Sequence, residues 1–272
     1  MTQRKTYSQA LLRAVRQMGH EDWYFQTDRF REDDIWLASY PRSGSHFARF
    51  ILVSARHFLR YGGFPADLSG MKTIPDVHGG RLEFAEAAPR IIKTHFPFDP
   101  RYKRVIHLIR DPRDVIVSYF HYSQGLPHLF LEPVSGELSL AEFADLFLHG
   151  KVWPCGIRRH TSTYIEQSAN IEYTRIRYED LLTEPRQEYP RLLKAADIYL
   201  PDDVLEALIA HTSFDNMRRL HTPESARAGL VESNPVHILR RGISGQHAQL
   251  LHDQVREHLD ARLADYLATL HY

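Results

Sequence analysis

The chain has 272 residues, enough for one large domain with a hydrophobic core. Lysine plus arginine equals aspartate plus glutamate, so the formal net charge is zero and the basic excess typical of nucleic-acid-binding proteins is missing. Cys155 is the only cysteine, which excludes an intrachain disulfide and is typical of a reducing compartment.

The N-terminal segment has helical spacing over residues 5–30, with Leu11 and Val15 on one apolar stripe. It lacks the apolar stretch of a signal peptide, and no segment has the apolar length of a membrane span. We therefore expect a cytoplasmic protein without membrane or nucleic-acid partners. We predict one domain over residues 1–272, with residues 1–31 as a helical extension packed on it.

A buried strand is predicted at residues 34–40, where the chain is apolar. A helix is predicted at 45–60, because apolar residues recur at helical spacing from Phe47 to Phe58. Glycine and proline are frequent in 61–90, which predicts a long irregular connection, and such connections are often functional.

Two more short strands are predicted at 90–96 and 104–110, and a helix at 111–123. Helical spacing returns at 139–168, and Pro154 predicts a break within it.

The last third of the chain begins with a predicted strand at 171–180. Helical patterns follow at about 179–199 and 202–220. A polar loop at 221–245 precedes an amphipathic helix at about 247–270.

Strands separated by helices predict an α/β fold with a central parallel sheet flanked by helices, although the pattern leaves the strand order open. In such folds, ligands bind at the carboxyl ends of the strands. Three unusual polar segments, 41–46, 93–97 and 110–118, fall at such ends.

The first of these segments has the composition of an anion cradle. A helix N-terminus presents unpaired N–H groups, and Gly44 lets the backbone approach a ligand closely. Ser43, Ser45 and Arg42 add hydroxyl and guanidinium donors. The alternative is that serine and glycine only cap the helix. The P-loop sequence GxxxxGK[ST] is absent.

In the other segments, Arg110 ends a strand and Ser118 lies two turns into the next helix, so both could reach one phosphate. The alternative is a salt-bridged strand–helix junction. Lys93 and His95 lie two residues apart at a strand end and point to the same side, which suits leaving-group stabilisation and proton removal. Residues 240–245 form a basic loop that is either an anion clamp or a solvated turn.

Together these segments resemble the cytosolic-type sulfotransferases, which use 3′-phosphoadenosine 5′-phosphosulfate (PAPS). The similar segments, in the order of that family, are YPRSGS (40–45), KTHFP (93–97), RDPRDVIVSYFHY (110–122), YEDL (178–181), TSFDNM (212–217) and RRGISG (240–245). Arg42 stands where the family usually has lysine, and Phe47 where it usually has tryptophan.

The resemblance implies a P-loop-like nucleotide-binding architecture, PAPS as donor, 3′-phosphoadenosine 5′-phosphate (PAP) as product, and no metal. It assigns the 5′-phosphate to Arg42, Ser43, Gly44, Ser45 and His46, and the 3′-phosphate to Arg110, Ser118, Arg240, Arg241 and Gly242. It assigns adenine to Phe47, Tyr178, Thr212 and Phe214. The implied catalytic residues are His95 as general base, with Lys93 and Arg42 contacting the transferring group and the leaving phosphate.

The expected reaction is in-line sulfuryl transfer to a hydroxyl or amine of a small-molecule acceptor. Its pocket is expected from loops 61–90, 122–150 and 221–239, which contain Tyr61, Phe64, His78, Phe84, Tyr122, His128 and Phe130. Two alternatives stay open: a nucleotide-dependent phosphotransferase, and a non-catalytic nucleotide-binding protein on the same fold. The acceptor and the oligomeric state stay open as well.

Overall fold

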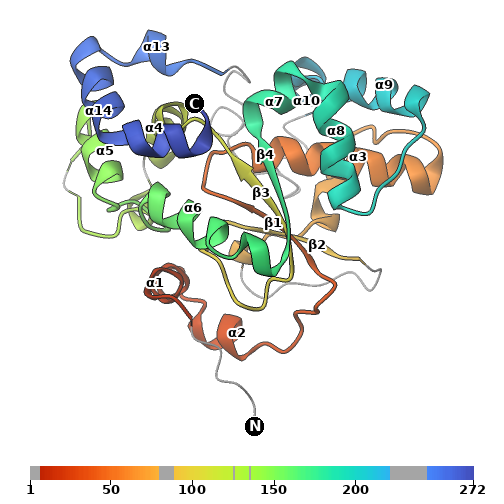
Figure 1. Ribbon diagram of the computed structural model, residues 1–272, viewed down its shortest axis with the longest axis horizontal. Helices are drawn as coiled ribbons and strands as arrows, with labels where there is room; N and C mark the ends of the chain where they lie inside the picture. Colours follow the sequence, from red (N-terminus) through yellow and green to blue (C-terminus); the bar gives the residue numbers. More distant parts are fainter. Residues whose placement is uncertain (1–6, 80–88, 125, 135, 221–243) are drawn as a thin grey trace.

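Four parallel strands form the centre of the protein in the order β2-β1-β3-β4 (Figure 1). Their bounds are β1 Ile35–Ser39, β2 Ile91–Thr94, β3 Arg104–Ile109 and β4 Glu172–Arg177. The computed structural model describes residues 7–79, 89–124, 126–134, 136–220 and 244–272. Every residue of β1 and β2 is buried, as expected for parallel strands that are covered on both faces.

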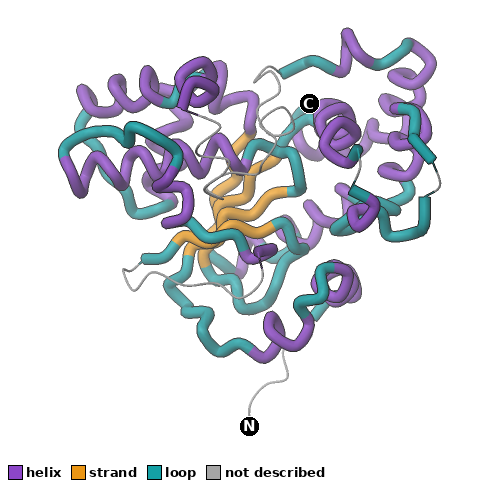
Figure 2. Tube along the Cα trace, turned by 180° about the vertical axis from the view of Figure 1, so that it is seen from behind, coloured by secondary structure: helices purple, strands orange, loops and turns teal. Residues whose placement is uncertain are grey.

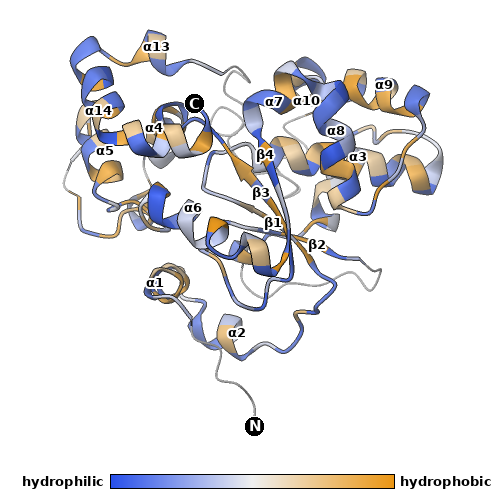
Figure 3. Cartoon of the chain, viewed as in Figure 1, coloured by the Kyte–Doolittle hydropathy of each residue, from blue (hydrophilic) through white to orange (hydrophobic). Residues whose placement is uncertain are grey.

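Side-chain alternation along β1 divides the core into two layers. Ile35 and Leu37 belong to one buried cluster, whereas Trp36 and Ala38 belong to the other. Figure 2 shows the strands enclosed between helical layers, and Figure 3 shows hydrophobic residues along β3 and several hydrophilic residues along β4.

Helices of the first layer are α3 Ser45–Tyr61, α7 Tyr178–Thr183, α8 Pro185–Ala195, α9 Asp202–His211 and α10 Phe214–Leu220. The second layer contains α1 Gln9–Gln17, α2 Glu21–Gln26, α4 Pro112–Ser123, α5 Leu140–Leu148, α6 Ile157–Ile165 and α14 Asp253–Leu270, with the short α13 His247–Leu250 before α14. Helices α1 and α2 bury Leu11, Val15 and Tyr24, and Trp153 donates to the Ala14 carbonyl at 3.1 Å. None of the described helices has the length and apolarity needed to span a bilayer.

These elements confirm the predicted α/β class with a parallel sheet and flanking helices, but several boundaries differ. The predicted strand at 171–180 extends three residues past the end of β4, because β4 ends at Arg177 and Tyr178 already begins α7. The helical pattern at 179–199 contains two helices, because Pro185 lacks the N–H needed to continue α7 and instead begins α8.

Candidate active site

Three predicted site segments begin at the carboxyl ends of neighbouring strands. The chain passes from β1 to β2 on one side of β1, and later enters β3 on its other side. The order in which strands are added thus reverses between β1 and β3. Ligands of open α/β sheets bind at such a topological switch point. The turns after β1 and β3 flank it directly, and β2 carries Lys93 beside them.

The turn from β1 to α3 is built on left-handed backbone. Gly44 has a φ of 95°, and a Cβ atom there would lie 2.2 Å from Cδ2 of Tyr178. Only glycine fits both the conformation and the close approach. Arg42 has a φ of 70°, which is uncommon for a residue with a side chain and occurs often at functional sites. No side chain caps α3, so its N-terminus suits an anion.

Arg110 joins the turn after β3 to the turn after β1. Its guanidinium donates to the Arg42 carbonyl at 3.3 Å and lies 4.6 Å from the centre of the Tyr178 ring. Nε of Arg42 donates to Oγ of Ser118 at 3.1 Å. The structure thus brings together Arg42, Ser118, Arg110 and Tyr178, which the sequence predicted for one nucleotide site.

The other predicted nucleotide residues lie at different depths. Phe47 contacts the Tyr178 ring edge-on, with the ring centres 6.2 Å apart. The Thr212 hydroxyl is buried between the Leu208 carbonyl and Oη of Tyr189, so it belongs to the packing of α8 against α9. Ser43 and Ser45 are buried, and His46 and Phe214 are half-buried. The last three predicted residues, Arg240, Arg241 and Gly242, lie outside the described residues.

His95 follows β2 and is held by β1. Its Nδ1 lies 2.8 Å from the Ser39 carbonyl and must therefore donate its proton there, which leaves Nε2 as the basic nitrogen. Burial, the charge of Lys93 and the neighbouring His78 hold the pKa of His95 well below its usual value. The ring is therefore neutral at pH 7 and able to accept a proton.

Lys93 forms an ion pair with Asp76. Burial alone would raise the pKa of the Asp76 carboxyl, but the charge of Lys93 lowers it well below its usual range. Asp76 is therefore ionised, and it fixes the ammonium of Lys93 at the end of β2.

Several supporting residues were missed from the sequence. Ser39 positions His95, Asp76 positions Lys93, and His160 donates from Nε2 to the His95 carbonyl at 3.1 Å. The Asp114 carboxylate accepts from the N–H groups of Gly245 and His247. Only Asp114 lies within one of the motifs at the strand ends, so it alone had a signal in the sequence.

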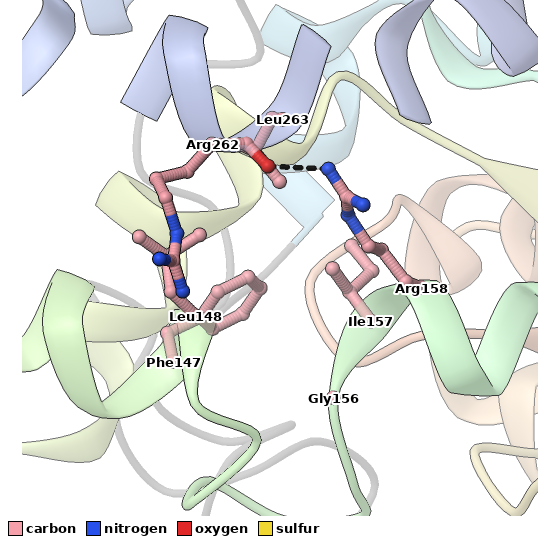
Figure 4. Close-up of a pocket in the computed structure, with 7 residues that line it drawn as sticks. All are labelled: Phe147, Leu148, Gly156, Ile157, Arg158, Arg262 and Leu263. Carbon is pink, nitrogen blue, oxygen red and sulfur yellow. Dashed lines mark hydrogen bonds between the residues drawn. The ribbon is translucent and has the colours of Figure 1, made fainter. Parts of the chain in front are cut away.

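A separate pocket of about 230 Å³ lies between α5, α6 and α14 (Figure 4). Phe147, Ile157 and Leu263 contribute apolar surface, and Arg158 donates to the Arg262 carbonyl across it. None of the predicted site residues lines this pocket.

Comparison with known proteins identifies similar chains. The family model described as "Sulfotransferase domain" matches residues 32–270. Sulfotransferase 1A1 of Mus musculus is 26% identical over 254 residues, which cover 85% of this chain and 84% of the relative. Sulfotransferase 1B1 of Canis lupus familiaris is 26% identical over 236 residues, which cover 79% of this chain and 77% of the relative.

Two solved structures share the fold. Mouse sulfotransferase SULT7A1 complexed with PAP gives a TM-score of 0.67 at 22% identity, covering 88% of this chain and 85% of that one. Retinol dehydratase in a complex with retinol and PAP gives a TM-score of 0.70 at 17% identity, covering 87% of this chain and 82% of that one.

Proposed function

The chain belongs to the sulfotransferase domain family, and on that premise we propose that it transfers a sulfuryl group from PAPS to a hydroxyl or amine of a small-molecule acceptor. The solved relatives described above are complexes with PAP, and one of them also holds retinol. These complexes support a nucleotide donor and a small organic acceptor for this chain.

The residues present fit a nucleotide with two phosphates. The uncapped start of α3, together with Arg42, Ser43 and Ser45, would hold the 5′-phosphate. Arg110 and Ser118 lie beside it and would hold the 3′-phosphate, as the family resemblance implies. The backbone at Gly44 lies so close to the Tyr178 ring that a Cβ atom there would collide with it.

When bound, PAPS supplies the sulfuryl group and leaves as PAP. His95 would take the proton of the acceptor at Nε2 while Nδ1 remains bonded to Ser39. Lys93 and Arg42 would place positive charge opposite the oxygens that become negative during in-line transfer, by analogy with phosphoryl transfer.

One observation carries the proposal. A neutral histidine with a fixed tautomer lies beside Lys93, which pairs with Asp76, at the strand end next to the uncapped start of α3. A general base and a preorganised cation at one place are what in-line transfer to an acceptor requires.

Calorimetric titration with PAP, ATP and AMP tests this proposal. Tight binding of PAP alone is expected, because only PAP carries the 3′-phosphate assigned to Arg110 and Ser118. The same protein should release PAP when PAPS is mixed with an acceptor. Equal affinity for ATP and PAP would favour a phosphotransferase, and binding without turnover would favour a non-catalytic nucleotide-binding protein.

A further inference from the structure

The short turn at residues 76–79 packs against the end of β2 and contacts Lys93 and His95. The Lys93 N–H donates to the Pro75 carbonyl at 2.8 Å, and the Asp76 carboxylate pairs with the Lys93 ammonium. The Asp76 carboxylate also accepts from the His78 N–H at 3.1 Å, which fixes the following residue. This turn therefore presents His78 beside His95.

The imidazole of His78 lies against that of His95. The two rings are nearly parallel, with 9° between their planes and 5.2 Å between their centres. Nε2 of His78 accepts the backbone N–H of His95. The edges of Phe96 and Trp153 enclose the same ring, with centres 4.4 Å and 4.9 Å away.

The tautomer of His78 follows from these contacts. Burial lowers its pKa to about 3, so the ring is neutral, and an Nε2 that accepts requires the proton on Nδ1. This Nδ1 is buried and has no hydrogen-bond partner among the described residues. The side chain as a whole is only 9% exposed. A buried donor without a partner is unfavourable, and such groups are rare unless a ligand or water completes them.

We propose that Nδ1 of His78 donates a hydrogen bond to the acceptor oxygen, and that this contact selects hydroxyl acceptors over amines. The inference rests on the proposed sulfuryl transfer. A hydroxyl oxygen has two lone pairs, so one can attack sulfur while the other accepts from His78. A neutral amine has a single lone pair, which the new N–S bond consumes. Beside an amine, the His78 donor therefore stays unpaired during the reaction.

The reaction balances with the residues present. The acceptor oxygen forms the new O–S bond as the S–O bond to the leaving 5′-phosphate breaks. His95 takes the hydroxyl proton at Nε2. The donor from His78 faces an oxygen that gains negative charge as its proton leaves, and hydrogen bonds to charged oxygens are stronger than those to neutral ones. The hydrogen bond from His78 is therefore strongest while the sulfuryl group is being transferred to the hydroxyl oxygen.

Two substitutions separate the two nitrogens of the ring. In His78→Gln, the side-chain oxygen can replace Nε2 as acceptor of the His95 N–H, but the donor at the Nδ1 position is lost. In His78→Asn, the amide N–H₂ replaces the Nδ1 donor, but the Nε2 acceptor is lost. His258→Gln, at an exposed position on α14, is the matched control.

Each protein is assayed with 2-naphthol and 2-aminonaphthalene, which form a pair that is neutral at pH 7 and differs only in hydroxyl and amine. We expect sulfation of the hydroxyl member of the pair. We expect His78→Gln to lower its kcat/KM about 10- to 100-fold, the size of one lost hydrogen bond to a charged oxygen, and His78→Asn to lower it less. PAP affinity should stay unchanged in all variants, which also shows that they are folded.

Opposite results overturn the inference. If His78→Asn loses more activity than His78→Gln, the histidine acts only by holding the His95 backbone. If His78→Gln keeps kcat/KM within about threefold of the unaltered protein, the Nδ1 donor plays no part. Preference for the amine member of the pair contradicts the selection of hydroxyls. If the unaltered protein fails to bind PAP, the proposed function itself fails, and calorimetry separates that result from the others.

Discussion

His95 combines two properties that a general base needs. Its Nδ1 proton is committed to the Ser39 carbonyl, and burial together with Lys93 keeps the ring neutral. The sequence could place His95 at a strand end, but the tautomer depends on the neighbouring strand. Contacts of this kind join residues far apart in the chain, so no local pattern encodes them.

Replacing His95 with alanine should lower kcat by about 10²–10⁴, the usual contribution of a general base. PAP affinity should not change, because the contacts of His95 are with Ser39, His78 and His160 rather than with the turn at Arg42. Single-turnover sulfation and calorimetry measure the two effects separately. Unchanged turnover would falsify the assignment of the base.

Gly44 offers a test of the nucleotide turn. Gly44→Ala places a Cβ atom in left-handed backbone, which costs about 1–2 kcal/mol, and presses it against the Tyr178 ring. We expect a loss of more than about 2 kcal/mol in the free energy of unfolding, and weaker PAP binding because Tyr178 must move.

Gly62→Ala is the control for Gly44→Ala. Gly62 has a φ of 74°, but nothing lies within 4 Å of a Cβ atom placed there. Its substitution should therefore show the backbone cost alone, with PAP affinity unaltered. Equal effects of both substitutions on PAP binding would mean that the contact with Tyr178 does not shape the nucleotide site.

At the scale of elements, helix α4 connects the proposed nucleotide site to the C-terminal part of the chain. Buried Asp114 accepts from the N–H groups of Gly245 and His247 at 2.7 Å and 2.9 Å, and from Nδ1 of His247 at 3.0 Å. Nη2 of Arg110 lies 3.5 Å from the same carboxylate. The segment at 245–247 is thereby fixed beside the residue proposed for the 3′-phosphate.

Substituting Asp114 with alanine should lower the free energy of unfolding by about 3 kcal/mol, because buried N–H donors lose a charged acceptor. PAP binding should weaken as well, since Arg110 loses one of its partners. Urea unfolding and calorimetry measure these effects. Asp260→Ala is the control, because the partly exposed pair of Asp260 with Arg113 should contribute less than about 1 kcal/mol. Similar losses from both substitutions would contradict a special role for Asp114.

The helices and strands were largely predictable from the sequence, whereas the residues that position His95 and Lys93 were not. Apolar spacing located all four strands and the helix at 45–60 to within a few residues, because burial dictates periodicity. Glycine and charged residues at strand ends located the turn that we propose for the 5′-phosphate. The roles of Asp76 and His78 depend on how an irregular connection folds back onto β2, and irregular backbone has no periodicity to detect.

Across the whole molecule, buried neutral histidines make the free energy of unfolding depend on pH. His78 and His160 each have a pKa lowered to about 3 by burial. Burial also lowers the pKa values of His95 and His107 well below the usual 6.5. These four rings line the second core layer and the end of β2, so their protonation would place several charges in one part of the interior.

The sign of the pH effect follows from these shifts. Below pH 6.5 the unfolded chain takes up protons at these histidines, whereas the folded protein does not, so stability falls as the pH falls below 6.5. Each histidine contributes about 1.4 kcal/mol per pH unit, and four contribute about 5 kcal/mol. A typical domain stability of about 5–15 kcal/mol would be lost within one to three units below pH 6.5.

We therefore expect urea midpoints that are constant between pH 8 and 7 and fall steeply below pH 6.5. His107→Gln should reduce the slope by about a quarter, whereas His258→Gln, at an exposed site, should leave it unchanged. Carboxylates with a lowered pKa, such as Asp114 at about 2, lose their contribution only below about pH 3.8 and do not affect this range. A midpoint that stays level from pH 7.5 to 5 would mean that these rings take up protons in the folded protein as readily as in the unfolded chain, which would contradict their lowered pKa values.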